Sequence, residues 1–160
     1  MSSRFGARHP VGLYVLCAVE LFERFAGTLL GSLLLLYLNE RLGMAAGAAT
    51  RLGGTFNAAI YLSSVIGGVI ADRWLGTRRA MLLGALLLSF GYAVLSIDSA
   101  TLLYPAAGLL MVGHALFKPS ISSAVGKLYP RNDPRRDDAY SLFYVVFNIG
   151  SGCGPVAGGF

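Results

Sequence analysis

The chain of 160 residues is 55% hydrophobic and only 13% charged. Its mean hydropathy of +0.63 is too high for a soluble domain of this size and indicates a polytopic membrane protein. A formal net charge of +5 is compatible with a nucleic-acid binder, but the basic residues are dispersed between apolar segments, so we expect no nucleic-acid partner. Cys17 and Cys153 fall inside apolar segments, which argues against a disulfide framework.

Five apolar segments are candidates to cross a bilayer as helices, which needs about 20 residues each. Their approximate bounds are 11–38, 54–73, 79–97, 101–127 and 138–160. We expect helices because transmembrane strands would alternate apolar and polar residues. Asp98 and Ser99 are expected to form a tight turn between the third and fourth segments. The predicted fold class is therefore an all-α membrane protein with about five transmembrane helices.

Lys and Arg residues are concentrated in alternate loops. Nine of them lie before the first segment, between the second and third, and between the fourth and fifth: Arg4, Arg8, Arg73, Arg78, Arg79, Lys127, Arg131, Arg135 and Arg136. The opposite loops hold only Arg41 and Arg51. By the positive-inside rule, the N-terminus should be cytoplasmic, in a plasma (inner) membrane.

The first segment contains an unusual cluster of charges, Glu20, Glu23 and Arg24. A charge at the centre of a transmembrane helix costs about 2.5–3.5 kcal/mol on insertion scales, so these side chains must be paired or face water. Their spacing of i, i+3 and i+4 places them on one helix face. Two interpretations remain open at this stage, a buried ion-coupling site and a structural ion pair between packed helices.

Other polar residues fall at a similar predicted depth. At about 1.5 Å per residue, Glu20 and Lys118 each lie about 14 Å from the cytoplasmic end of their helices, Asn148 about 15 Å, Tyr61 about 18 Å and Arg24 about 20 Å. This shared layer near the bilayer centre predicts that Lys118 pairs with Glu20. The alternative is that Lys118 extends to the membrane surface.

His114 precedes Lys118 by one helical turn and lies on the same face. It could relay protons, because the pKa of histidine is near physiological pH, or it could simply bond to a neighbouring helix.

The turn between the second and third segments carries a further pattern. Asp72 is at the C-terminal end of its helix, where the helix dipole disfavours an anion, so we expect a cation partner among the nearby arginines. Gly76 permits a tight reversal of the chain. The cluster is interpreted either as a gate or as a simple stop-transfer signal.

Four stretches resemble one transporter family. The sequence Glu20–Phe25 resembles the ExxERF motif of the proton-coupled oligopeptide transporters, a branch of the major facilitator superfamily. The stretch from Gly68 to Arg79 resembles that superfamily's signature between helices 2 and 3. Residues 116–119 and 140–150 resemble the family's fourth- and fifth-helix motifs. The resemblance covers residues 20–158, and the order of the four motifs makes it specific.

This resemblance implies roles for individual residues. Proton coupling would involve Glu20, Glu23, Arg24 and Lys118; substrate binding would involve Arg24, Tyr61, Lys118 and Asn148; and gating would involve Gly68, Asp72, Arg73, Gly76, Arg78 and Arg79. No metal, cofactor or catalytic residue is implied. The chain departs from the family at four positions: Gly27 and Thr28 replace two tyrosines, and Phe147 and Gly152 replace the usual fifth-helix residues.

The resemblance implies a proton-coupled symporter that imports di- or tripeptides or related small molecules by alternating access. A facilitator of a different substrate, such as a drug or a sugar, is the alternative. An enzyme is disfavoured because the two histidines lie at different depths and no HExxH or GxSxG motif is present. We expect residues 1–160 to be part of an N-terminal six-helix half that requires the C-terminal half of the same polypeptide, and therefore not to transport alone.

Overall fold

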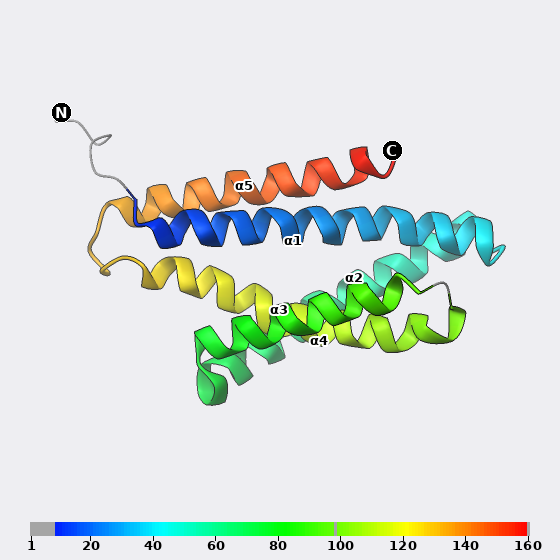
Figure 1. Ribbon diagram of the computed structural model, residues 1–160, viewed down its shortest axis with the longest axis horizontal. Coiled ribbons are helices and arrows are strands. Elements are labelled where there is room, and N and C mark those ends of the chain that lie inside the picture. The colour runs from blue at the N-terminus through cyan, green and yellow to red at the C-terminus, as the bar shows by residue number, and fades with distance from the viewer. Residues whose placement is uncertain (1–8, 98, 160) are drawn as a thin grey trace. The chain divides into compact units, whose positions relative to one another are not determined.

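The computed structural model describes residues 9–97 and 99–159, and every regular element in these ranges is helical (Figure 1). The elements in chain order are α1 (Val11–Leu36), η1 (Tyr37–Arg41), α2 (Ala46–Ile70), η2 (Ala71–Leu75), α3 (Thr77–Leu95), α4 (Ala100–Lys127) and α5 (Arg135–Ala157). The two short η segments are π-helical turns that extend α1 and α2. Arg4, Arg8, Asp98 and Phe160, which entered the predictions above, lie outside the described residues.

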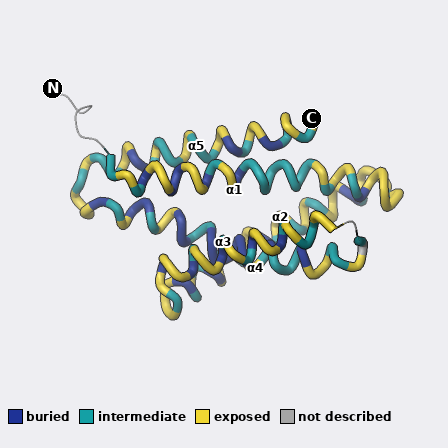
Figure 2. Tube along the Cα trace, viewed as in Figure 1, coloured by how far each residue is buried: buried dark blue, intermediate teal, exposed yellow. Residues whose placement is uncertain are grey.

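Four of the described helical segments are long and apolar enough to cross a membrane: Val11–Arg41, Ala46–Leu75, Thr77–Leu95 and Thr101–Lys127. The fifth, α5, has 23 residues, but its charged first turn and Asn148 make it less apolar. Exposed residues occur along all the helices (Figure 2). They include large apolar side chains such as Trp74 at 80% and Tyr104 at 81%. Lipid tails can cover such side chains, whereas their exposure to water is unfavourable.

The second helix differs from its predicted bounds, because α2 begins at Ala46 and not near residue 54. Two polar side chains in its first turns bond back to carbonyl groups of the same helix. The Thr50 hydroxyl donates to the oxygen of Ala46, and Arg51 Nε donates to the oxygen of Gly47 at 3.1 Å. Apolar content alone locates the middle of a transmembrane helix but not its polar ends, which explains the error.

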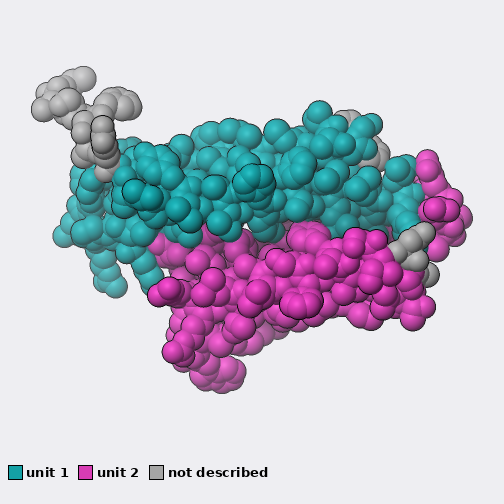
Figure 3. Space-filling view, in the orientation of Figure 1, with its two compact units in different colours: residues 1–37, 125–160 teal, residues 38–124 magenta. Residues whose placement is uncertain are grey.

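The chain divides into two compact units, residues 1–37 with 125–160 and residues 38–124 (Figure 3). In the first unit, α5 runs beside α1 (Figure 1). Two glycines of α5 allow this close approach: a Cβ atom on Gly150 would lie 2.6 Å from the oxygen of Leu21, and one on Gly154 would lie 2.8 Å from the oxygen of Phe25. Small residues at such positions are typical of helix contacts in membranes.

Glycines also bring the helices of the second unit together. A Cβ atom on Gly84 of α3 would lie 2.8 Å from the backbone nitrogen of Phe117 in α4. A Cβ atom on Gly67 of α2 would overlap the carbonyl oxygen of Ala115. Pro119 lies four residues after Ala115 and has no N–H group, so it cannot donate the usual helical hydrogen bond to that oxygen. The α2 backbone therefore approaches α4 where proline interrupts the hydrogen-bond ladder.

Candidate ion and substrate site

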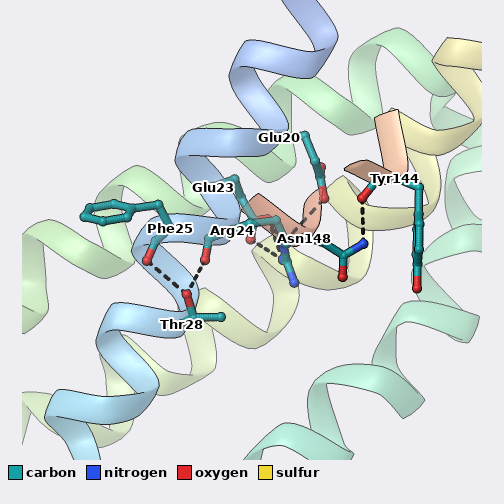
Figure 4. A network of polar contacts seen from close by, with 7 residues as sticks. All are labelled: Glu20, Glu23, Arg24, Phe25, Thr28, Tyr144 and Asn148. Atoms are coloured by element: carbon teal, nitrogen blue, oxygen red, sulfur yellow. Dashed lines mark hydrogen bonds and ion pairs between the residues drawn. The ribbon is translucent and has the colours of Figure 1, made fainter. Parts of the chain in front are cut away.

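The three charged residues of α1 form one buried cluster (Figure 4). Their exposed fractions are 3% for Glu20, 8% for Glu23 and 7% for Arg24. Arg24 Nε and Nη2 donate hydrogen bonds of 2.6 Å to the two carboxylate oxygens of Glu23. Arg24 Nε also lies 3.4 Å from Glu20 Oε1, one helical turn away. The spacing in the sequence therefore predicted the shared face correctly.

The cluster places two carboxylates and one guanidinium on a single helix. Removing such charges from water carries a large desolvation cost, which their attraction and hydrogen bonds must offset. The two-point hydrogen bond of Arg24 is the geometry in which a guanidinium best satisfies a carboxylate. Counted on α1 alone, the cluster has an excess of one negative charge, which a proton or a further cation can neutralise.

Thr28, one of the two residues that replace family tyrosines, lies in the contact between α1 and α5. Its hydroxyl donates to the oxygen of Arg24 at 2.8 Å (Figure 4). A Cβ atom on Gly154 would overlap that hydroxyl oxygen. Position 28 is therefore part of the helix contact, where a small side chain is compatible with the close approach of α5.

The polar residue predicted on α5, Asn148, is exposed, and its Nδ2 donates to the oxygen of Tyr144 at 2.7 Å (Figure 4). Its neighbour Phe147 was singled out only as a departure from the family pattern. In the structure, the Phe147 ring lies against the cluster, with Arg24 Cζ 5.2 Å from the ring centroid. Sequence reasoning missed this contact because it joins different helices at no recognisable spacing.

The second unit brings together two more of the predicted substrate residues. Lys118 Nζ of α4 lies 4.5 Å from the centroid of the Tyr61 ring of α2, a distance typical of a cation–π interaction. Tyr61 is 61% exposed, and His114, one turn before Lys118, is buried at 5%. The pairing of Lys118 with Glu20 stays a prediction, since the two residues belong to different units.

The turn between α2 and α3 has the predicted glycine reversal. Gly76 adopts φ 74° and ψ 149°, a conformation that residues with a side chain rarely adopt. A Cβ atom on Gly68 would contact Pro119 of α4 at 3.4 Å. The charged residues of the turn are exposed: Asp72, Arg73, Arg78 and Arg79.

The expected cation partner of Asp72 is not found. In the part of the chain that the structure describes, no ion pair within 4.0 Å joins Asp72 to Arg73, Arg78 or Arg79. The prediction assumed that the helix dipole would be offset by an ion pair, but solvent can screen an exposed carboxylate instead.

The sequence profile of the Major Facilitator Superfamily matches residues 16–160. The chain belongs to the Major Facilitator Superfamily. It is therefore an integral membrane protein of a transporter family and not an enzyme. Its helices match the N-terminal part of solved transporters of the oligopeptide (POT) branch.

Homologues of this superfamily member include peptide permeases. It is 40% identical over 146 residues to the dipeptide and tripeptide permease A of Chromobacterium violaceum, covering 90% of this chain and 30% of that protein. It is 37% identical to the permease of the same name from Klebsiella pneumoniae, covering 90% of this chain and 29% of that protein. The chain thus spans about a third of the length of the relatives that it matches.

Solved structures give the same result for the fold. A POT family transporter in complex with 5-aminolevulinic acid matches with a TM-score of 0.89 and 37% identity, covering 97% of this chain and 33% of that chain. A POT family transporter in complex with a thioalcohol-conjugated peptide matches with a TM-score of 0.89 and 38% identity, covering 96% of this chain and 32% of that chain.

A second, partly buried charge pair of this superfamily member lies at the start of α5. Asp133 Oδ1 accepts a hydrogen bond of 2.9 Å from the backbone nitrogen of Arg135, and Arg135 Nη2 lies 2.8 Å from Asp133 Oδ2. Hydrogen bonds from Arg135 lower the pKa of the Asp133 carboxyl. Nearby, His9 Nδ1 and the Tyr129 hydroxyl are hydrogen-bonded at 2.7 Å, and burial raises the pKa of Tyr129.

No group of three histidine, cysteine, aspartate or glutamate side chains with the geometry of a metal site occurs in residues 9–97 and 99–159.

Proposed function

We propose that the chain forms part of a proton-coupled symporter that imports di- or tripeptides, or related small molecules, by alternating access. The observation that carries this proposal is the buried cluster of Glu20, Glu23 and Arg24, in which two carboxylates share one guanidinium. Ionisable groups inside a membrane are costly and usually serve ion or substrate pathways. Homologues named dipeptide and tripeptide permease support the substrate class.

In this proposal the cluster changes its charge during transport. A proton on Glu20 or Glu23 neutralises the excess negative charge on α1 and weakens the hold of the carboxylates on Arg24. The guanidinium can then bind the carboxylate of a peptide with the same two-point geometry that it uses toward Glu23. Coupling follows because substrate and proton both act on the ion pairs of Arg24.

The remaining predicted residues supply the other parts of the site. Lys118 is proposed to contribute a second positive charge, both for proton coupling and for binding the substrate. The Tyr61 ring lies against the Lys118 ammonium group and is proposed to hold that group in place. Asn148 is proposed as a hydrogen-bonding group for the peptide. These assignments are supported by the resemblance to the family's motifs and by the Lys118–Tyr61 contact.

We also propose the membrane arrangement. The helices would belong to the first six-helix half of a carrier with two halves around a midplane site, in the plasma membrane, with a cytoplasmic N-terminus. The turn with Gly68, Asp72, Arg73, Gly76, Arg78 and Arg79 would act as a cytoplasmic gate. The glycine reversal at Gly76 supports a rigid connection between α2 and α3 in this gate.

The direct test is uptake of a labelled dipeptide by the natural-length protein in liposomes with an inward proton gradient. We expect saturable accumulation that disappears when the gradient is removed. Glu20→Gln, which keeps the shape but not the charge, should abolish accumulation and spare exchange of internal for external peptide. Gradient-driven accumulation that persists in this variant would contradict the proposed coupling role.

The substrate is tested separately by competition against the labelled dipeptide. The panel contains tripeptides, 5-aminolevulinic acid, sugars and amphipathic drugs. If only tripeptides and 5-aminolevulinic acid compete, the result supports a carrier of peptides and related amino acids, because these ligands share a carboxylate and an amine. Competition by sugars or drugs alone would support the alternative facilitator.

A further inference from the structure

The Arg24 guanidinium lies over an aromatic ring to which no role has been assigned. Arg24 uses the edge of its guanidinium group toward Glu23 and Glu20. The same guanidinium lies over the ring of Phe147 of α5, with Arg24 Cζ 5.2 Å from the ring centroid. A cation within about 6 Å of a ring centroid is attracted by the ring's electron density, more strongly when both groups are desolvated.

Phe147 is itself held in place by its own helix. The rings of Tyr144 and Phe147 are stacked, with centroids 6.0 Å apart and an interplanar angle of 3°. The spacing of three residues places both on one side of α5. Stacking of this kind restricts the rotation of Phe147 and presents its ring to α1.

The backbone contact next to this ring fixes the distance between the helices. Gly150 follows Phe147 by three residues, and a Cβ atom there would lie 3.0 Å from Arg24 Cβ. The α5 backbone therefore approaches α1 at Arg24 itself. The ring of Phe147 reaches the guanidinium because of this approach.

We propose that Phe147 is a positioning residue that holds the Arg24 guanidinium by a cation–π interaction in the orientation that pairs with Glu23. The ring restrains the group from one face while the carboxylates bind its edge. Arginine suits this arrangement because its planar group can stack and form a two-point hydrogen bond at once, which lysine cannot do. The contact itself is independent of transport, whereas its effect on substrate binding rests on the proposed function.

The first test measures how often Arg24 leaves this arrangement. The natural-length protein is purified in detergent with Phe147 replaced by mono-, di- or trifluorophenylalanine, which withdraw electron density from the ring but barely change its shape. Modification of Arg24 by phenylglyoxal is followed by peptide mass spectrometry, with the exposed Arg79 as internal reference. We expect the rate at Arg24 to rise with each fluorine, and by about two- to thirtyfold in Phe147→Leu.

The matched control is the same series at Phe143, which lies one turn earlier on α5. Fluorination there should leave the Arg24 rate unchanged. If the rate is equally unchanged by fluorine at Phe147, the ring only fills space and the proposal is overturned. This outcome does not depend on whether the protein transports peptides.

The second test concerns the functional consequence, in the natural-length protein. In the proposed function the peptide carboxylate binds the same edge of the guanidinium after Glu23 releases it, so the ring keeps that edge oriented for either carboxylate. Phe147→Leu should therefore raise the KM for a dipeptide with a free carboxylate several-fold and leave kcat close to wild type, whereas Phe147→Tyr should restore the wild-type KM. Absence of dipeptide uptake by the wild-type protein would contradict the proposed function, and the fluorine series would still decide the contact. Equal effects of Leu and Tyr on KM would show that the ring does not act on the substrate.

Discussion

Arg24 and Glu23 are adjacent in the chain, yet their side chains form a two-point hydrogen bond with both distances at 2.6 Å. Arg135, the first residue of α5, forms a similar fork with Asp133, with Arg135 Nη2 2.8 Å from Asp133 Oδ2. The Arg24 side chain is 8% exposed and that of Arg135 is 38% exposed. The two arginines therefore differ in burial, whereas the side chains of Glu23 and Asp133 are 7% and 11% exposed.

The first prediction compares Lys substitutions at the two forks. Arg24→Lys keeps the charge but loses the planar fork, so one buried carboxylate hydrogen bond is lost, at a cost of about 1.5–3 kcal/mol. Arg135→Lys should lower the free energy of unfolding less than Arg24→Lys, because Arg135 is more exposed and solvent can replace the lost bond. Thermal unfolding of the chain in detergent measures both. Equal destabilisation by the two variants would show that burial of the Arg24 cluster does not strengthen it.

The second prediction concerns the contact between α1 and α5. Gly150→Ala would place a Cβ atom 2.6 Å from the backbone oxygen of Leu21, so the helices must separate. Overpacking of this kind typically costs about 1–3 kcal/mol. Gly152→Ala is the matched control on the same helix, because a Cβ atom there meets nothing within 4 Å. We expect a lower Tm for the first variant only, and an unchanged Tm for both would contradict the close packing.

Much of α1 and of the turn could be predicted from the sequence because the governing rules are local. The i, i+3, i+4 spacing places Glu20, Glu23 and Arg24 on one face whatever surrounds the helix. Gly76 was predictable because only glycine adopts its backbone conformation without strain. The start of α2 at Ala46 was missed because hydropathy does not register polar residues that bond to their own helix.

The contacts between helices were less accessible to sequence reasoning. The cation–π contact of Phe147 with Arg24 joins residues more than 100 positions apart in the chain, and it depends on the rotation and separation of the two helices that carry them. Thr28 was noted only as a replacement for a family tyrosine, yet its hydroxyl lies in the helix contact, near Gly154. A residue type at one position does not reveal which neighbour it faces.

The third prediction concerns the reversal between α2 and α3. Gly76→Ala forces a side chain into φ 74° and ψ 149°, at a cost of about 1–3 kcal/mol. Gly47→Ala is the control, since a Cβ atom at this position in α2 meets nothing within 4 Å. Alanine favours a helix over glycine, so the control should be neutral or slightly stabilising. Thermal unfolding distinguishes the two, and a stable Gly76→Ala variant would contradict the conformation described for this turn.

The fourth prediction is a dependence of stability on pH at the start of α5. The pKa of Asp133 is lower in the folded chain than the usual value of about 3.9. A group with a lowered pKa stabilises the fold fully above its unfolded pKa, and this contribution is lost as the pH falls through the folded value. Asp133→Asn should therefore lower the Tm slightly at pH 7 and reduce the further loss of Tm on acidification below about pH 4.

Asp137→Asn controls for the loss of one negative charge near the same helix end. This variant should keep the acid dependence that the Asp133–Arg135 pair produces. If Asp133→Asn and wild type respond identically to acid, the hydrogen bonds from Arg135 do not contribute to stability.

The fifth prediction tests the coupling role of Lys118 in the natural-length protein. Lys118→Ala should abolish proton-driven accumulation of dipeptide, because the predicted partner of Glu20 is removed. Exchange of internal for external peptide should suffer less, since it needs no net proton movement. Accumulation that persists unchanged in this variant would mean that Lys118 is structural or extends to the membrane surface.

Variants of Tyr61 keep the charge of Lys118 and test whether the Tyr61 ring positions it. Lys118 Nζ lies 4.5 Å from the Tyr61 ring centroid, and Tyr61→Phe keeps this ring face while removing the hydroxyl. Tyr61→Leu removes the face and should weaken dipeptide binding by about two- to fivefold, the range for a partly exposed cation–π contact. If both variants bind as wild type, the ring does not position Lys118. If both weaken equally, the hydroxyl is the group that matters, because it is the only feature that the two variants have both lost.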